Sequence, residues 1–413
     1  MELFSGNSEK VNYRKIADGS FIAEKPFDSF SYRLSASIPP NILTVAHISW
    51  IYGDNGILKL NDLLPVFEMN NKTTVSIELP EKWKISTVEQ NTGQNEFAVR
   101  RNENAVFVIG RGWSEHKFSV SGANINLILD DKWTIEKNDI EKIIKEILLE
   151  YESYFGTIPQ KNLEIINFKF PKDVGFERWR AETNGGNIII MSAQTTFESQ
   201  MKQRFREQLR HEIFHFWMPN NLNLSGNYSW FYEGFAQYTA LRSGVALNQI
   251  SFSDFLNTLE QANNLTGRRS QPISLVEASK NRWINENSSV YAKGLAVAFL
   301  MDVALLKQSG GKQDLISVMR RIYDTHKFPN KKEDGNAAVM TILESYKELA
   351  PVINAHIKGS EKLNFEKDLE QTGLEISSNG SDIKLQVKET LSGREKDFLD
   401  KLGYNNWRKI LSK

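Results

Sequence analysis

The first 130 residues show the hydrophobic patterns of β-strands. Hydrophobic and polar residues alternate in 75–79 and 97–99, and 106–109 is a short, wholly apolar run. Turn-forming clusters such as 53–56 (Gly-Asp-Asn-Gly) separate these runs, and 121–130 is predicted to be the last strand of the group. The pattern therefore predicts an N-terminal β-domain over residues 1–130.

After that point the spacing of apolar residues becomes that of an amphipathic helix. From Ile140 to Phe155, isoleucine, leucine and aromatic residues recur on one helical face. Gly156 is expected to end this helix, and Asn138 with Glu141 has the pattern of a capping box at its start. The sequence thus predicts a helix of about five turns beginning near residue 138.

The rest of the chain divides into three further units. Two strand-like segments, 163–170 and 186–192, join the helices before residue 250 in an α+β unit predicted over 131–250. The pattern over 251–375 is mostly helical, and 376–413 is a short tail with one strand-like run and one helix. The predicted fold class is therefore α+β, with several domains.

Composition excludes some chemistry and leaves the partners open. The 413 residues include 51 basic and 51 acidic side chains, so the net charge of zero gives no indication of nucleic acid or anionic membranes as partners. The chain has no cysteine, which excludes disulfides, a thiol nucleophile and thiolate metal ligands. Any metal must therefore be held by histidine, carboxylate or water.

Targeting signals are weak. The segment 1–10 lacks the basic and then apolar pattern of a signal peptide. The best apolar run, 295–306, contains Asp302 and is too short to span a bilayer, so no transmembrane segment is expected. The chain as given is expected in the cytoplasm, or in the periplasm or outside the cell if a signal peptide has been removed.

The segment 211–215, His-Glu-Ile-Phe-His, carries the strongest chemical signal. In a helix, His211 and His215 lie one turn apart on the same face, so both imidazoles can reach one Zn²⁺ ion. Glu212 can then hold the attacking water as a general base. Flanking apolar residues predict a helix that Pro219 ends. The alternative is two histidines that only satisfy local hydrogen bonds.

A catalytic zinc site usually has three protein ligands, and Glu233 is the candidate for the third. It follows His215 after a loop rich in Pro, Asn, Gly and Ser, in a second predicted helix from 229 to 242 that Gly244 closes. Two helices joined by a loop can place Glu233 opposite the histidines, and its aromatic neighbours argue against an ordinary surface position. The alternative is a carboxylate favoured at a helix start by the helix dipole.

The motif 211–215, a loop and then WFYEGF at 230–235 resemble the gluzincin metallopeptidases, and among them the glycyl aminopeptidase family. That family has an aromatic residue inside HExxH, a Trp soon after it and a Glu-Gly-aromatic turn, as here. The segment 289–295 is similar to its Tyr-x-Lys-Gly segment. The resemblance implies a thermolysin-like zinc catalytic domain between the β-domain and a C-terminal helical domain.

The resemblance also implies a role for Tyr291. In related zinc aminopeptidases the matching tyrosine hydrogen-bonds the oxyanion of the tetrahedral intermediate, and a phenol suits this because it is a neutral donor. The alternative is a tyrosine that only packs at a helix start. The resemblance is weaker at both ends, at 47–50, 63–65, 79–83, 357–359 and 372–374.

The chain departs from the family at the segment that edges the cleft. Family members usually carry GG-x-Glu-His there, and the counterpart here has Gly185, Gly186 and Asn187 without the Glu or the His. In related aminopeptidases that Glu anchors the free amine of the substrate, and Glu182 is the candidate replacement. The glycines are expected to let a peptide approach and pair by main-chain hydrogen bonds.

Two further departures concern the surroundings of the site. Gln237 stands where some gluzincins have an acid that supports a histidine ligand. The 376–413 tail is too short for the PDZ module that many relatives have.

The sequence predicts a zinc metallopeptidase with one Zn²⁺ per chain and a peptide or protein substrate. His211, His215 and Glu233 are the predicted ligands, and Glu212 and Tyr291 the predicted catalytic residues. Whether it acts as an exo- or an endopeptidase stays open. Two alternatives also remain: a peptide-binding scaffold without catalysis, and a zinc hydrolase of a non-peptide substrate.

Overall fold

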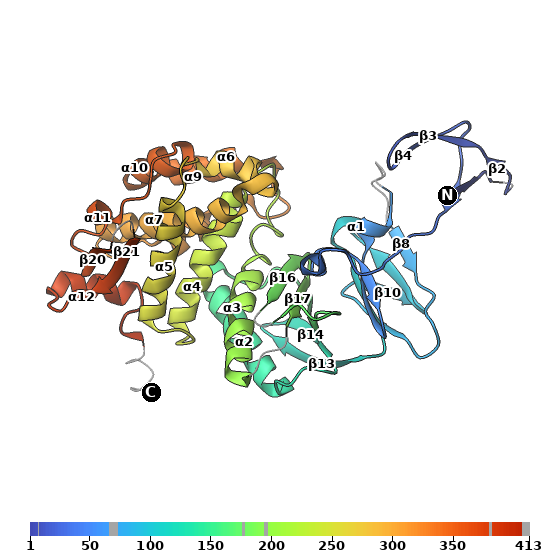
Figure 1. Cartoon of the computed structure of the whole chain (residues 1–413), viewed down its shortest axis with the longest axis horizontal. Coiled ribbons are helices and arrows are strands. Elements are labelled where there is room, and N and C mark those ends of the chain that lie inside the picture. The colour runs from blue at the N-terminus through green and yellow to red at the C-terminus, as the bar shows by residue number, and fades with distance from the viewer. Residues whose placement is uncertain (7, 66–72, 176–177, 194–196, 380–381, 407–413) are drawn as a thin grey trace.

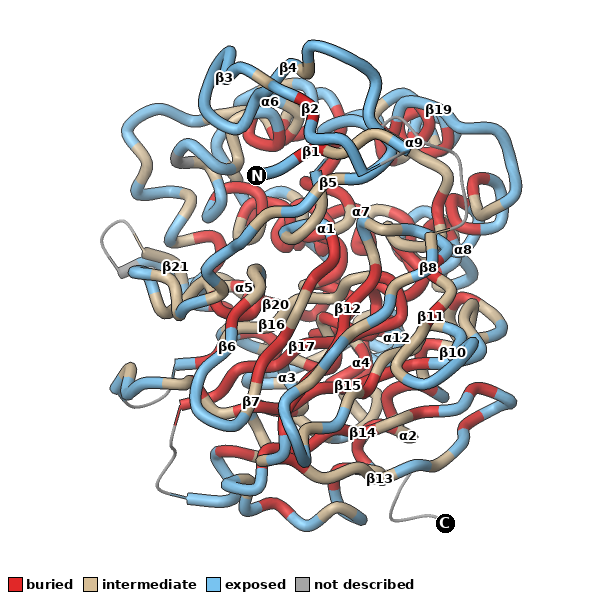
Figure 2. The backbone as a smooth tube through the Cα atoms, turned by 90° about the vertical axis from the view of Figure 1, so that its right-hand side faces the viewer, coloured by how far each residue is buried: buried red, intermediate tan, exposed pale blue. Residues whose placement is uncertain are grey.

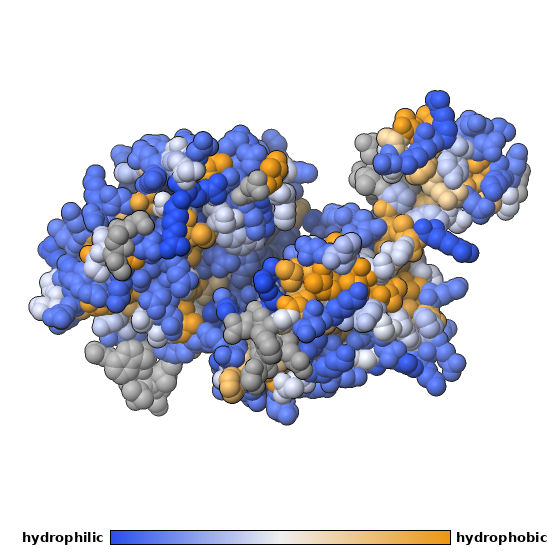
Figure 3. Space-filling model, in the orientation of Figure 1, coloured by the Kyte–Doolittle hydropathy of each residue, from blue (hydrophilic) through white to orange (hydrophobic). Residues whose placement is uncertain are grey.

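A computed structural model of the chain describes all residues except 7, 66–72, 176–177, 194–196, 380–381 and 407–413. Figure 1 shows small sheets at one end, a larger sheet with helices α2 (Lys137–Phe155) and α3 (Glu198–Phe214) in the middle, and a helical half at the other end. This confirms the predicted α+β multidomain architecture. Figure 3 shows a recess between the helical half and the part that contains the sheets.

The N-terminal part is made of small sheets. Among the described residues, the strands before residue 111 form four sheets of two to four strands, ordered β2-β1-β5, β3-β4, β10-β11-β8 and β6-β7-β12-β9. The strands are β1 (Glu2–Phe4), β2 (Lys10–Val11), β3 (Tyr13–Ala17), β4 (Ser20–Ala23), β5 (Ser29–Ser31), β6 (Trp50–Tyr52), β7 (Asn55–Lys59), β8 (Thr73–Ser76), β9 (Lys84–Ser86), β10 (Gln90–Gly93), β11 (Glu96–Val99) and β12 (Val106–Gly110). Three short helices lie among them, η1 (Ile42–Thr44), α1 (Leu60–Leu63) and η2 (Asn102–Asn104).

Burial differs along this part. Figure 2 shows β3 and β4 exposed, whereas β7 and β12 are largely buried. Trp50 and Val108 of the β-domain share a hydrophobic cluster with Ile128 and Phe168 of the larger sheet. The β6–β12 sheet is therefore joined to the next domain by an apolar contact.

The larger sheet has five strands in the order β13-β14-β15-β17-β16. They are β13 (Trp113–Val120), β14 (Ala123–Asp130), β15 (Asn162–Lys169), β16 (Trp179–Asn184) and β17 (Asn187–Ser192). β14, β15 and β17 pair in parallel, and β13 and β16 are antiparallel edge strands. The predicted boundary at residue 130 is wrong, because β14 is hydrogen-bonded to β15 inside this sheet.

Two of the predicted helix ends also need correction. α2 buries its isoleucine face and is followed by Gly156, as expected. However, its N-cap is Glu136 without a side-chain cap bond, so Asn138 already lies inside the helix and the predicted capping box is wrong. α3 ends at Phe214 rather than near Pro219, and the chain continues in hydrogen-bonded turns to Asn221.

The C-terminal half is mostly helical, as predicted. Its elements are β18 (Leu224–Ser225), η3 (Trp230–Phe235), α4 (Ala236–Ala246), α5 (Phe252–Gly267), α6 (Leu275–Lys280), η4 (Arg282–Glu286), η5 (Ser289–Lys293), α7 (Gly294–Ser309), α8 (Leu315–His326), β19 (Glu333–Asp334), α9 (Gly335–Glu344), η6 (Lys347–Leu349), α10 (Ala350–Val352), η7 (Ile353–Lys358), α11 (Phe365–Asp368), β20 (Leu374–Asn379), β21 (Asp382–Val387) and α12 (Gly393–Lys401). The strand-like run and the helix predicted in the tail correspond to β21 and α12.

Helix α7 is the centre of this half. η5 and α7 form one helical segment, Ser289–Ser309, whose 21 residues and mean hydropathy of 1.7 would suit a membrane span. However, 83% of its apolar window is buried inside the protein, so the core accounts for its composition. Asp302 is fully buried there and pairs with Arg242 at 2.7 Å.

Candidate metal centre

The C-terminal end of α3 brings the two motif histidines together. His211 lies in its last turn and His215 directly follows its last residue, and their Nε2 atoms are 3.2 Å apart. Nδ1 of His215 lies 3.0 Å from the carbonyl oxygen of Met218, so its Nε2 is free to bind a metal. Nδ1 of His211 has no hydrogen-bond partner among the described residues, consistent with the glutamine at 237.

Glu233 comes from η3, which packs against the segment that carries Tyr291. Gly234 and Gly294 are in close contact, since a Cβ on Gly234 would lie 2.5 Å from Cα of Gly294. The glycines of the Glu-Gly and Lys-Gly motifs therefore allow the two backbones to approach, which sets Glu233 beside Tyr291. Gly244, by contrast, lies inside α4 against Arg210 and does not close the helix as predicted.

The three predicted ligands converge on one point. Oε2 of Glu233 lies 3.2 Å from Nε2 of His211 and 3.6 Å from Nε2 of His215. Ligand atoms about 2.1 Å from a tetrahedral zinc ion lie about 3.4 Å from one another, so this donor set fits Zn²⁺ without rearrangement. Two imidazoles and one carboxylate also leave a fourth position for water.

The electrostatics of the three ligands agree with this arrangement. Burial alone would raise the pKa of Glu233, but hydrogen bonds and charge from His211 and His215 hold it well below its usual value. Burial alone would lower the pKa of His215, yet the Glu233 carboxylate raises it. Glu233 thus stays ionised, as a carboxylate ligand for a cation must be.

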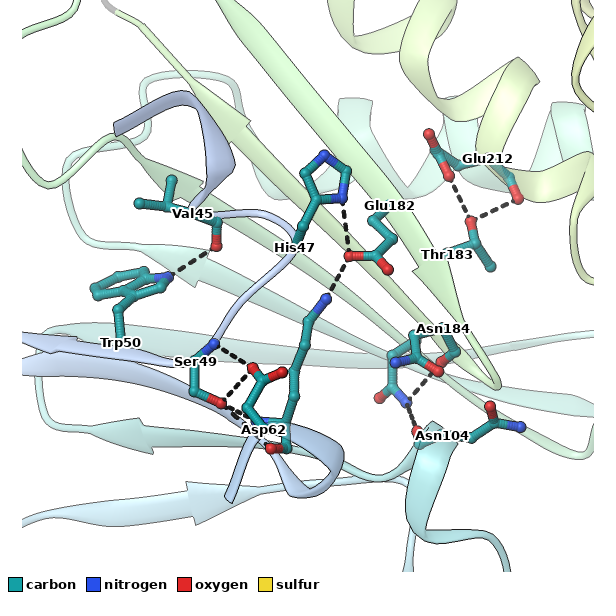
Figure 4. Close-up of polar contacts among 12 residues, drawn as sticks. Val45, His47, Ser49, Trp50, Asp62, Asn104, Glu182, Thr183, Asn184 and Glu212 are labelled. Carbon is teal, nitrogen blue, oxygen red and sulfur yellow. Dashed lines mark hydrogen bonds and ion pairs between the residues drawn. The ribbon is translucent and has the colours of Figure 1, made fainter. Parts of the chain in front are cut away.

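Glu212 is buried beside this centre and contacts the sheet edge. Oγ1 of Thr183 in β16 lies 2.7 Å from Oε2 of Glu212 and 2.9 Å from its carbonyl oxygen (Figure 4). A hydroxyl at this distance fixes the carboxylate while leaving its other oxygen free for a water proton. Thr183 carried no signal in the sequence, because nothing local shows that β16 lies against α3.

Tyr291 lies beside His211. The two ring centroids are 5.9 Å apart, and burial together with the Glu233 carboxylate raises the pKa of Tyr291 well above its usual value. The phenol therefore stays protonated and can donate a hydrogen bond. Arg282 also contacts this tyrosine, and no sequence motif had included it.

The prediction for the glycine segment is wrong in its placement. Gly185 and Gly186 form the turn between β16 and β17, and Asn187 lies in the inner strand β17 with its side chain buried. The side chain of Asn187 donates to the carbonyl oxygens of Asn184 and Asn104. The free edge is β16, so these residues are not placed to pair with a peptide as expected.

Glu182 faces away from Glu212. Successive side chains of a strand point to opposite faces, and here Thr183 contacts Glu212 whereas Glu182 points to the β-domain. There it accepts a hydrogen bond from Lys59 and lies 3.1 Å from Nδ1 of His47 (Figure 4). The geometry gives no support to Glu182 as a replacement amine anchor.

The α+β architecture and the cluster of His211, His215 and Glu233 are compatible with a zinc metallopeptidase. Comparison with protein families agrees, because residues 140–354 match the peptidase family M1 domain. The chain therefore belongs to peptidase family M1. No curated protein matches the chain.

Solved structures share the fold at low sequence identity. An aminopeptidase N family protein from Idiomarina loihiensis is 16% identical with a TM-score of 0.75, over 91% of this chain and 70% of that chain. An M1 zinc metallopeptidase from Deinococcus radiodurans is 12% identical with a TM-score of 0.58, over 88% and 86%. A mutant of an M1 zinc metallopeptidase from that organism, bound to a Tyr-Ser-Ala substrate, has the same identity and coverage and a TM-score of 0.59.

Proposed function

We propose that this protein hydrolyses peptide bonds at a zinc ion held by His211, His215 and Glu233. The observation that carries the proposal is the convergence of their three donor atoms within 4.8 Å, next to the buried Glu212. A binding scaffold would need neither this carboxylate nor the protonated phenol of Tyr291 beside His211.

The chain supplies the groups that peptide hydrolysis needs. Zinc, when bound, would lower the pKa of a water molecule and polarise the scissile carbonyl. Glu212 takes the proton of the attacking water and delivers it to the leaving amine. Tyr291 donates a hydrogen bond to the oxygen on which negative charge develops. Thr183 keeps Glu212 in one orientation during both proton transfers.

The edge strand β16 is the place where a peptide can bind along the sheet. It is the outer strand beside β17 and lies directly against Glu212 through Thr183. An extended substrate can pair with such an edge by main-chain hydrogen bonds. This assigns to β16 the role that the sequence suggested for Gly185, Gly186 and Asn187.

The exo- or endopeptidase question turns on the missing amine anchor. The face of β16 that meets Glu212 carries Thr183, whose side chain is a neutral hydroxyl. Glu182 lies on the opposite face, where it pairs with Lys59 and His47. We infer a preference for cleavage inside peptides, since a free amine would find no carboxylate from β16 there. A glycyl aminopeptidase activity, as the motif resemblance implies, is the alternative.

Mass spectrometry of a mixed peptide pool tests the proposal. Half of the pool is N-acetylated, and the zinc-loaded protein is compared with Glu212→Gln. Cleavage inside blocked peptides by the wild type alone is the expected result. Trimming of free N-termini alone would instead mean an aminopeptidase with another anchor. Absence of cleavage by both proteins would contradict the proposal and favour a binding scaffold or a non-peptide substrate.

A further inference from the structure

A buried arginine joins the metal centre to the catalytic tyrosine. Nη1 of Arg282 lies 3.0 Å from Oε1 of Glu233, and Nη2 donates to the hydroxyl of Tyr291 at 2.9 Å. Nε donates to Oδ1 of Asn287 at 3.1 Å, and the side chain is only 11% exposed. All three nitrogens of the guanidinium are therefore used, two of them on groups of the proposed active site.

We propose that Arg282 is a positioning residue that fixes Glu233 as a one-oxygen ligand and orients the hydroxyl of Tyr291. The inference rests on the proposed peptidase function and deepens it. The first part follows from the two oxygens of Glu233. Oε1 is taken by Arg282, whereas Oε2 faces the two histidines at 3.2 and 3.6 Å. Only Oε2 is thus presented to a metal ion.

The second part follows from the chemistry of the two side chains. Arginine has hydrogen-bond donors and no acceptor, so the oxygen of Tyr291 must be the acceptor in their contact. The single hydroxyl hydrogen of Tyr291 therefore points away from Arg282. Without substrate the Glu233 carboxylate accepts it, and a substrate oxygen takes over as acceptor in the proposed reaction. The positive charge beside the phenol also strengthens it as a donor to developing negative charge.

The guanidinium packs against two rings. Its central carbon lies 4.6 Å from the ring centroid of Trp283 and 5.4 Å from that of Tyr291. Trp283 is 84% exposed, so it contributes little to the core and instead lies where it covers the arginine. A lysine could supply the charge but not the planar fork that reaches two acceptors at once.

A neighbouring arginine provides a matched control. Arg269 binds the same segment from outside the site, through Oε1 of Glu286 at 2.7 Å and Oγ of Ser289 at 2.8 Å. It contacts neither Glu233 nor Tyr291 in the described contacts. Arg269→Ala therefore removes an arginine that stabilises η4 and η5 but does not contact the site. If it has the same effect as Arg282→Ala, the effect comes from the stability of these helices and not from the contacts with Glu233 and Tyr291.

The experiment compares zinc affinity and kinetics in Arg282→Ala, Arg282→Lys and Arg269→Ala. Zinc affinity is measured by competition with a chromophoric chelator, which needs no turnover. We expect Arg282→Ala to lose about 10- to 100-fold in zinc affinity, the range for groups that orient metal ligands. At saturating zinc, kcat should fall with little change in KM. Added guanidinium should restore part of kcat, and Arg282→Lys should recover less than the wild type.

The coupling to Tyr291 is tested in the background of Tyr291→Phe. Since Arg282 acts there through the hydroxyl, Arg282→Ala should lower kcat less in Tyr291→Phe than in the wild type. Circular dichroism confirms folding, and Arg282→Lys replaces the alanine variant if that variant does not fold.

Two results would overturn the inference. One is Arg282→Ala with zinc affinity and kcat within about twofold of an active wild type, a range that excludes an orienting role of the expected size. The other is an equal loss of zinc affinity in Arg269→Ala. If the wild type binds zinc but cleaves no peptide, the proposed function fails, and the zinc affinities still decide the role of Arg282 toward Glu233.

Discussion

Glu233 in the metal centre and Glu164 in strand β15 are both buried carboxyl groups, but their surroundings differ. Around Glu233 stand His211, His215 and the guanidinium of Arg282. Hydrogen bonds and charge from the two histidines hold its pKa well below the usual value against the effect of burial. Glu164 receives hydrogen bonds only from neutral groups, Oγ of Ser86 and Nδ2 of Asn126. Burial there raises its pKa from 4.5 to about 7.

The comparison shows that burial by itself favours the neutral form of a carboxyl group. A carboxylate that is to bind a cation therefore needs partners that offset the cost of burying its charge. The metal centre does so with cationic and hydrogen-bonding partners from α3 and η4. The β15 site lies between the β-domain and the larger sheet and has no cation among its described contacts. One carboxyl group is therefore arranged to stay ionised, and the other to be neutral below about pH 7.

Replacing a ligand should have the largest effect on the metal centre. In His215→Ala, two donors remain, so we expect the protein to lose its equivalent of zinc and all zinc-dependent activity. Metal analysis after dialysis measures this. His116→Ala is the control, because His116 pairs with Glu141 at β13, the edge of the sheet opposite β16. One equivalent of zinc in His215→Ala would reject His215 as a ligand.

Removing the general base should leave the metal in place. Glu212→Gln keeps the shape of the side chain and the contact with Thr183, so zinc should stay bound while kcat falls by roughly 10²–10⁴. Steady-state kinetics with a peptide identified in the pool measures the fall. Glu182→Gln is the matched control on the opposite face of β16. Near wild-type activity in Glu212→Gln would contradict the mechanism.

Glu164, the other buried carboxyl group, should make the stability of the fold depend on pH. Because the folded pKa of Glu164 lies above its ordinary value of 4.5, its contribution is most favourable below about pH 4.5 and is lost as pH rises to about 7. The full loss corresponds to about 3 kcal/mol. Glu164→Gln should abolish this dependence. The unfolding free energy of the variant minus that of the wild type should therefore increase between pH 5 and pH 8.

Urea unfolding of both proteins at several pH values measures the difference. The exposed Glu81 carries the control substitution Glu81→Gln, which should follow the wild type at every pH. Parallel curves for Glu164→Gln and the wild type would show that Glu164 keeps the same charge in the folded and unfolded states.

Removing the contact between Thr183 and Glu212 should have the smallest effect of these four substitutions. Thr183→Val removes a hydrogen bond to a carboxylate, so kcat/KM should fall about 10- to 100-fold, the kinetic equivalent of such a bond. Thr183→Ser keeps the hydroxyl and should recover most of the activity. Equal activity in the valine and serine variants would mean that Thr183 does not orient the base.

The two histidines of the candidate metal centre could be predicted from the sequence because their relative position is set locally. A helix places residues 211 and 215 on one face, whatever the rest of the chain does. Helical and strand periodicities likewise indicated β14, β15 and β17 of the larger sheet, α2 and the helical C-terminal half, since burial of one face leaves a regular pattern. They did not indicate the edge strands β13 and β16. The motif spacing to Glu233 and Tyr291 completed the candidate site.

The partners that complete the site were decided by the tertiary structure. β14 appeared to belong to the β-domain, because periodicity predicts a strand and not its neighbour. Which strand forms the edge, and hence the positions of Thr183 and Gly185, follows from pairing between distant segments. Arg282 reaches Glu233 because α6, which directly precedes η4, packs against η3, and no local pattern encodes that contact. The sequence alone determined the chemistry of the ligands, and packing determined what surrounds them.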